Sequence, residues 1–134
     1  MDELKLQEGA GIIDILHNQN SGNVPSIPMP FERDIFLFDT YVAGTSYVEG
    51  IEELEPTLEE GTYLEFKREP QNEHDRHAIR IQNKDGQKLG YVPRKDNVVF
   101  ARLMDAGKLL FGRITHKEWK EEWLKIDIKV YLHE

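Results

Sequence analysis

The sequence predicts a small, mainly β domain (α+β) of about six strands with one central α-helix, preceded by an N-terminal extension. Three observations predict this class. Segments rich in β-branched and aromatic residues recur at short spacing, and one later segment has helical periodicity. The length of 134 residues suffices for one domain with one modest core.

Residues 1–33 are expected to form the extension or linker. Glycines interrupt their apolar spacing, so we expect only a short helix around residues 11–18. Prolines and turn-forming residues crowd the stretch that ends at Pro30, which is typical of a loop. The compact domain is therefore expected at residues 34–134.

The strands are expected where β-branched and aromatic residues run together or alternate with polar ones. Pro70 and Pro93 end the strands before them, because proline has no N–H to donate to a ladder. Asp85-Gly86 marks a hairpin turn, and residues 49–60 are expected to form a loop or one helical turn. The predicted strands are residues 35–42, 62–68, 78–82, 88–92, 109–115 and 123–132.

The helix is expected at residues 96–106. Asp96 is a candidate N-cap, Gly107 is a candidate C-terminal cap, and an apolar stripe lies between them. A charged turn at residues 116–122 is expected to join the last two strands. A sheet this short would leave two open edges, so we expect it to curl into a barrel of the oligonucleotide-binding (OB-like) or SH3-like kind.

Charge is unevenly distributed along the chain. The net charge is −8, from 17 basic and 25 acidic residues. Residues 1–65 hold 2 basic and 14 acidic side chains, whereas residues 66–95 hold 8 basic and 4 acidic ones. A basic segment inside an acidic chain is compatible with charges scattered over a solvated face. The sharper hypothesis is a local anion site whose acidic surroundings suppress indiscriminate binding to polyanions.

Several classes of function lack their motifs. There is no cysteine, which excludes disulfides, thiolate zinc sites and cysteine nucleophiles. No Gly-x-Ser-x-Gly or phosphate-binding P-loop pattern is present, so we expect a binding module, not an enzyme, and no cofactor. No apolar run approaches the roughly 20 residues of a membrane helix, and a cytoplasmic location without membrane contact is expected.

The loop before the third strand concentrates the polar residues. Asn72 and Asp75 suit either turn architecture or a phosphate site built from the loop. The spacing of His74, Asp75 and His77 suggests a metal site, but a complete ligand set would need a distant residue. Exposed loop histidines are the favoured interpretation, and no metal is predicted.

The same loop carries a long ordered pattern, Arg-Glu-Pro-x-Asn-x-x-Asp-x-x-Ala-Ile, followed by Gly-Tyr-Val-Pro. In this pattern the sequence resembles the HIRAN domain family over about residues 34–132. The resemblance implies a compact barrel related to the oligonucleotide-binding fold. It also implies recognition of single-stranded DNA at its free 3′-hydroxyl end, in DNA repair or replication-fork processing, with a helicase or nuclease as a partner protein.

The resemblance also implies roles for particular residues. Asp75 matches the acceptor of the terminal hydroxyl, and Asn72 matches a phosphate contact. His74 stands where the family has a ring packed on the terminal base. Tyr47 matches a base-stacking tyrosine, while Ser46 replaces an arginine that contacts phosphate.

Four further positions complete the predicted DNA-binding set. Tyr91 provides a ring after the glycine of the fourth strand, and Arg94 matches a phosphate-binding lysine, with Lys95 beside it. A late aromatic position of the family falls near Trp123, which on sequence alone serves core packing equally well.

A second hypothesis is kept open. A protein-interaction or assembly module on the same framework would use the acidic stretch at residues 49–60 and the apolar residues of the extension. A small hydrolase or metal enzyme is the weakest alternative. The sequence leaves the oligomeric state open.

Overall fold

The structure is a computed structural model that describes residues 33–134, so the expected extension and its helix at residues 11–18 lie outside the described part. The domain is mainly β, as predicted, and its strands form one antiparallel sheet in the order β1-β6-β5-β2-β3-β4. The strands are β1 (Asp34–Tyr41), β2 (Tyr63–Arg68), β3 (Ile79–Gln82), β4 (Lys88–Tyr91), β5 (Leu109–Lys120) and β6 (Trp123–His133).

The two edges of the sheet meet at one point, just after β1. Ala43 and Tyr91 exchange backbone hydrogen bonds of 2.7 and 2.9 Å, which tie the chain after β1 to β4. A Cβ atom on Gly90 would collide with the Ala43 carbonyl oxygen, so this approach needs glycine there. The sheet is thereby curled into a half-barrel related to the predicted OB-like fold.

The core lies inside the curve of the sheet. Alternate residues of β6 point inward and are buried, as the period of two along a strand requires. Phe100 and Ala101 of the helix α3 (Arg94–Asp105) close the core on one side. The inward residues of β6 are Leu124, Ile126, Ile128 and Val130.

The helix α3 starts earlier than predicted, and Asp96 is not its N-cap. Pro93 occupies the N-cap position and Arg94 begins the first turn. Asp96 instead accepts a 2.8 Å hydrogen bond from the Thr40 hydroxyl of β1. Pro93 has no side-chain group that could cap the helix, and the Asp96 N–H donates to the Pro93 carbonyl at 2.9 Å in the first turn.

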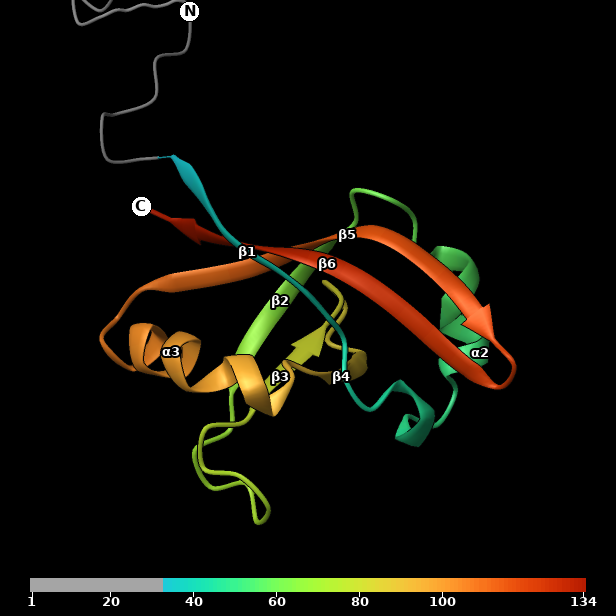
Figure 1. Cartoon of the computed structure of the whole chain (residues 1–134), viewed down its shortest axis with the longest axis horizontal. Helices are drawn as coiled ribbons and strands as arrows, with labels where there is room; N and C mark the ends of the chain where they lie inside the picture. Colours follow the sequence, from blue (N-terminus) through green and yellow to red (C-terminus); the bar gives the residue numbers. More distant parts are fainter. Residues whose placement is uncertain (1–32) are drawn as a thin grey trace, which may run out of the picture. The chain divides into compact units, whose positions relative to one another are not determined.

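The charged turn predicted at residues 116–122 is also wrong. β5 continues to Lys120, and the turn at Glu121–Glu122 has Glu121 at φ 60°. The charges lie on exposed or half-buried positions at the end of β5, within the long curved hairpin of β5 and β6 seen in Figure 1. Lys117 on this arm pairs with Glu55 at 2.7 Å, which joins it to the short helical stretch α2 (Ile51–Leu54) and η3 (Glu55–Thr57).

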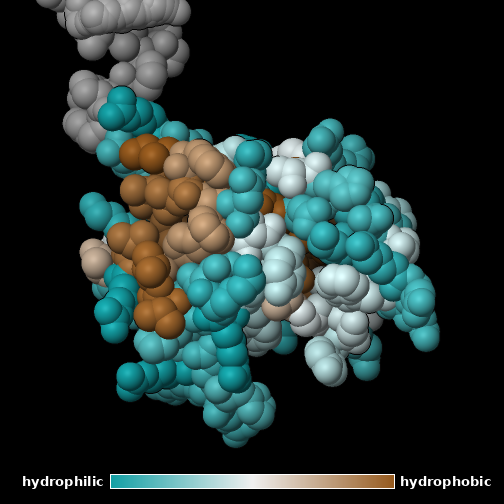
Figure 2. Space-filling model, viewed as in Figure 1, coloured by the Kyte–Doolittle hydropathy of each residue, from teal (hydrophilic) through white to brown (hydrophobic). Residues whose placement is uncertain are grey.

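An apolar surface covers part of β1 and α3, shown in brown in Figure 2. A hollow of about 360 Å³ there is lined by Leu37, Phe38, Val99, Phe100 and Leu103. Val99 is 64% exposed, so this face of α3 is open in the described domain. Within residues 33–134, no helix is long and apolar enough to cross a membrane.

Candidate nucleic-acid interface

A groove of about 450 Å³ lies between the loop at residues 69–78, the start of α3 and the chain after β1. Its floor is formed by β4, which the Ala43–Tyr91 pairing holds against that chain. Six of the eight residues predicted from the sequence line it together: Tyr47, Asn72, His74, Asp75, Tyr91 and Arg94.

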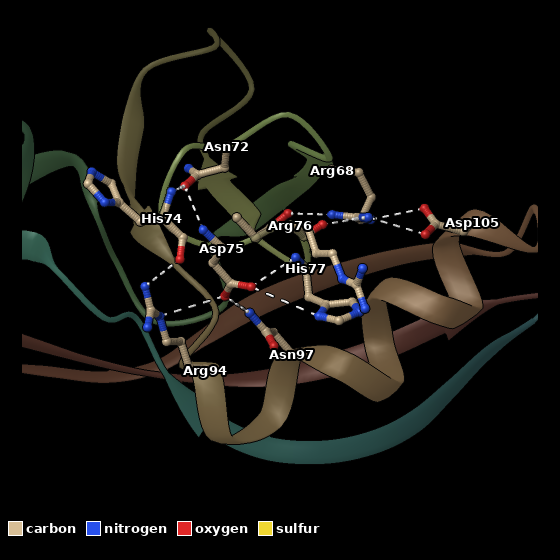
Figure 3. Close-up of polar contacts among 10 residues, drawn as sticks. Arg68, Asn72, His74, Asp75, Arg76, His77, Arg94, Asn97 and Asp105 are labelled. Atoms are coloured by element: carbon tan, nitrogen blue, oxygen red, sulfur yellow. Dashed lines mark hydrogen bonds and ion pairs between the residues drawn. The ribbon is translucent and has the colours of Figure 1, made fainter.

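Hydrogen bonds within the loop give it its shape (Figure 3). The Asn72 Oδ1 atom accepts from the backbone N–H groups of His74 and Asp75, at 2.8 and 3.1 Å. The Asp75 Oδ1 atom accepts from the His77 N–H at 2.9 Å. Both residues therefore have the turn-forming role that their type allows, and this role places them at the groove.

Asp75 is the acidic residue that lines the groove. Its side chain is 19% exposed, and its Oδ2 atom accepts a 2.7 Å hydrogen bond from the Asn97 amide of α3. Burial alone would raise the pKa of Asp75. The hydrogen bonds from His77 and Asn97 and the nearby Arg94 charge outweigh burial and bring this pKa below its ordinary value. Asp75 is therefore ionised at neutral pH.

Arg94 places a positive charge beside this carboxylate. Its Nη2 atom donates to the His74 carbonyl at 2.9 Å, and its Nε atom lies 3.8 Å from Asp75 Oδ2. The side chain is nevertheless 71% exposed, so most of the guanidinium faces solvent. A guanidinium in this position suits a phosphate oxygen.

A second hydrogen-bond network centres on Glu69, which does not itself line the groove but holds two residues that do. The Tyr91 hydroxyl donates to Glu69 Oε1 at 2.8 Å, and the Asn72 amide donates to the same oxygen at 3.1 Å. Burial raises the pKa of Glu69, but these hydrogen bonds and the nearby Lys88 charge outweigh it and lower this pKa overall. Lys88 lies over the Tyr91 ring at 4.5 Å, adding a cation to the groove.

Tyr47 is not a core residue. It ends the short helix η2 (Thr45–Tyr47), and its side chain is 92% exposed at the rim of the groove. An exposed ring at the edge of a groove offers a stacking surface.

Two predicted residues lie away from the groove. Lys95 lines the apolar hollow on the other side of α3, where it pairs with Asp96 at 3.7 Å and lies 5.6 Å from the Tyr41 ring. Trp123 lies at the tip of the β5–β6 hairpin, 37% exposed, in a separate hollow that it shares with Trp119 and Ser46.

The loop histidines do not converge. Figure 3 shows the His74 and His77 rings on opposite sides of Asp75. His77 Nδ1 lies 4.0 Å from Asp75 Oδ1, which is an ion-pair distance, while the His74 ring points away from both. Residues 33–134 contain no group of three or more histidine or acidic side chains arranged to hold a metal ion.

Asn97 and Lys88 line the groove but were missed by the sequence analysis. Asn97 lies three residues after Arg94, which puts the two on one face of a helix. That signal appears only when the helix starts at Arg94, as it does in the structure. Lys88 belongs to a short strand next to Tyr91, and nothing in its spacing points to the groove.

The groove combines an ionised carboxylate, exposed cationic groups and aromatic rings. The carboxylate accepts hydrogen bonds, the cations suit phosphate and the rings suit bases. The groove therefore offers partners to a ligand that carries hydroxyl, phosphate and aromatic groups together.

Comparisons with known proteins show the fold and the family of the chain. The chain is 30% identical over 77 residues to the helicase-like transcription factor of Mus musculus, covering 55% of this chain and only 7% of that protein. A crystal structure of a protein from Lactobacillus plantarum superimposes with a TM-score of 0.72 at 29% identity, covering 77% of this chain and 98% of that one.

The HIRAN domain of human HLTF superimposes with a TM-score of 0.59 at 17% identity, covering 74% of this chain and 78% of that one, which shows a shared fold. The sequence profile of the HIRAN domain matches residues 35–134, nearly the whole of the described domain. The chain therefore belongs to the HIRAN domain family.

Proposed function

We propose that this domain binds single-stranded DNA and holds its free 3′-hydroxyl end against Asp75. HIRAN domains are known as DNA-binding domains. The single observation that carries the finer proposal is the Asp75 carboxylate, fixed in the groove beside the exposed Arg94 guanidinium. Asn72, His74, Tyr91 and Tyr47 surround it.

The carboxylate selects for the chemistry of the DNA end. Each carboxylate oxygen can accept two hydrogen bonds, and the described contacts of Asp75 use one strong donor on each. A terminal hydroxyl would donate to a remaining lone pair. A terminal phosphate would bring two negative charges next to an ionised carboxylate, which is unfavourable in a partly buried site.

The neighbouring groups suit the rest of the last nucleotides. Arg94 and the second N–H of the Asn72 amide are available to the phosphate between them. The rings of His74, Tyr91 and Tyr47 offer stacking surfaces that do not depend on base identity. The module would therefore recognise an end without reading sequence.

Such a site binds and breaks no bond. Its groups hold a hydroxyl, a phosphate and bases, so we infer a binding module that keeps a DNA end bound. A held 3′ end is useful to proteins that unwind or trim DNA. We therefore propose a role in DNA repair or replication-fork processing, with a helicase or nuclease as partner.

The experiment is fluorescence anisotropy with labelled single-stranded DNA at low salt. The ligands are one oligonucleotide with a 3′-hydroxyl and the same oligonucleotide with a 3′-phosphate. We expect the hydroxyl end to bind more tightly, and Asp75→Ala to remove that preference. Lys84→Ala, in the exposed β3–β4 turn, is the matched surface control. Equal binding of both ends by the unaltered protein would overturn the proposal.

A protein-interaction module is the second candidate. The apolar surface over β1 and α3 favours it, since it places Phe38 and Val99 on the outside of the domain. Under this candidate, Val99→Glu abolishes assembly in sedimentation experiments and leaves DNA binding intact. If Val99→Glu instead lost DNA binding without a change in assembly state, the protein-interaction candidate would be wrong.

A further inference from the structure

Asn97 is a nearly fully buried polar residue in the groove wall. It lies in the first half of α3, with only 2% of its surface exposed. Its amide Nδ2 atom donates to Asp75 Oδ2 at 2.7 Å, the shortest hydrogen bond to that carboxylate. A buried amide that bonds an ionised carboxylate makes a strong, directional contact.

The two oxygens of Asp75 are held by different elements. Oδ1 accepts from the His77 N–H of its own loop, while Oδ2 faces α3, where the Asn97 amide donates to it and Arg94 Nε lies 3.8 Å away. With one oxygen fixed by the loop and the other by the helix, rotation of the carboxylate is prevented. The remaining lone pairs then point in set directions.

Attachment of the loop to the helix does not depend on this bond alone. Arg94 donates to the His74 carbonyl at 2.9 Å, and Arg68 joins the Arg76 carbonyl to Asp105 at the other end of α3. The distinct contribution of Asn97 is therefore the orientation of one carboxylate.

We propose that Asn97 is a positioning residue that fixes the Asp75 carboxylate in the orientation that receives the DNA terminus. This inference rests on the proposed function and deepens it. Asn97 itself need not touch the DNA. It sets the direction in which Asp75 accepts a hydrogen bond, and so sets the preference for a hydroxyl over a phosphate.

The test replaces Asn97 by leucine, which has nearly the same size and no donor. The matched control is Thr40→Val, which removes another hydrogen bond to the first half of α3, the 2.8 Å bond to Asp96, away from the groove. Affinities for 3′-hydroxyl and 3′-phosphate single strands are measured for each protein. Circular dichroism verifies the fold, and Asn97→Ala, which also lacks the donor and adds no charge, replaces the leucine variant if the latter does not fold.

We expect the hydroxyl-over-phosphate ratio to fall about tenfold in Asn97→Leu, the effect of one charge-assisted hydrogen bond. Thr40→Val should keep the ratio of the unaltered protein. If Asn97→Leu keeps that ratio, the positioning role is wrong while the proposed function stands. If the unaltered protein itself shows no preference, the proposed function fails and this inference fails with it.

A second readout does not involve DNA. The carboxyl resonance of Asp75 is followed by NMR as pH is lowered, in the unaltered protein and in Asn97→Leu. The charged groups that face Asp75 are Arg94 from α3 and His77 from the loop, and both remain in the variant. Loss of the Asn97 donor should move the titration of Asp75 to higher pH. An unchanged titration would overturn the positioning role.

Discussion

Arg68 at the end of β2 and Asp105 at the end of α3 form a two-point pair, with Nε–Oδ1 at 2.9 Å and Nη2–Oδ2 at 3.2 Å. The same guanidinium donates to the carbonyls of Ala78 and Arg76, at 2.8 and 3.0 Å. The Arg68 side chain thus joins the end of the loop at residues 69–78 to both the sheet and α3. Arg68 does not line the groove, but it bonds two carbonyls of the loop that does.

Arg68→Met is expected to destabilise the domain by about 2 kcal/mol, because it removes the pair with Asp105 and the donor to the Arg76 carbonyl, and leaves the Ala78 carbonyl with the Glu69 N–H alone. Urea unfolding followed by fluorescence measures this free energy. Arg102→Met, the same substitution at an exposed position of α3, is the control and should cost less than about 0.5 kcal/mol. Equal stabilities of the two variants would show that the junction contributes little.

Gly90→Ala is expected to destabilise the domain by about 2 kcal/mol or more, because the new methyl group collides with the Ala43 carbonyl oxygen. Gly86→Ala is the comparison. Gly86 has φ 83° with open space around it, so alanine there costs only backbone strain of about 1 kcal/mol. Thermal unfolding ranks the two. A Gly90 variant as stable as the Gly86 variant would argue against the close contact between β4 and the chain after β1.

Tyr47→Ala is expected to leave stability nearly unchanged, since the ring is 92% exposed. Single-strand binding should weaken by about 1 to 3 kcal/mol through the loss of one stacking surface. Tyr47→Phe retains the ring and should bind normally. Anisotropy and thermal unfolding of the same samples separate the two effects. Unweakened binding by the alanine variant would remove Tyr47 from the interface.

The stability of the domain should decrease at acidic pH. The pKa values of Glu69, Asp75 and Asp105 are lowered; for Asp105 the main cause is its hydrogen bond from Arg68. A carboxyl whose pKa is lower when folded stabilises the fold above its unfolded pKa of about 4, and that contribution is lost as pH falls through the folded pKa.

Urea unfolding at a series of pH values between 7 and 3 tests this dependence. The free energy of unfolding should decline mainly below about pH 4. Asp75→Asn should reduce the slope, because the variant has one titrating group fewer. A decline confined to pH 6–7, with a flat region below it, would point to histidines instead.

Much of the fold could be predicted because local signals agreed with tertiary structure. Proline, Asp-Gly and period-two alternation marked the strands, and β2, β3 and β4 lie within two residues of their expected bounds. The end of β5 could not be predicted. Residues 116–120 of β5 are mostly charged and lack an alternating apolar pattern. From the sequence alone, such a segment is indistinguishable from a charged turn, because its pairing with β6 is not known.

The site was predictable in part for a similar reason. Residues of one loop stay together in any fold, so Asn72, His74 and Asp75 reach the groove together. Lys95 does not, because neighbouring positions on a helix point about 100° apart and Arg94 takes the side that faces the groove. Whether Trp123 reaches the groove depends on where the tip of the β5–β6 hairpin lies. Whether Asn97 reaches it depends on which residue begins α3.

The most direct measurement is an NMR titration of the isotope-labelled chain with a short single strand that ends in a free 3′-hydroxyl. We expect chemical-shift changes that concentrate at Tyr47, His74, Asp75 and Arg94, and much smaller changes with the 3′-phosphate strand. Changes confined to the apolar surface of β1 and α3, or equal changes with both strands, would contradict end recognition in this groove.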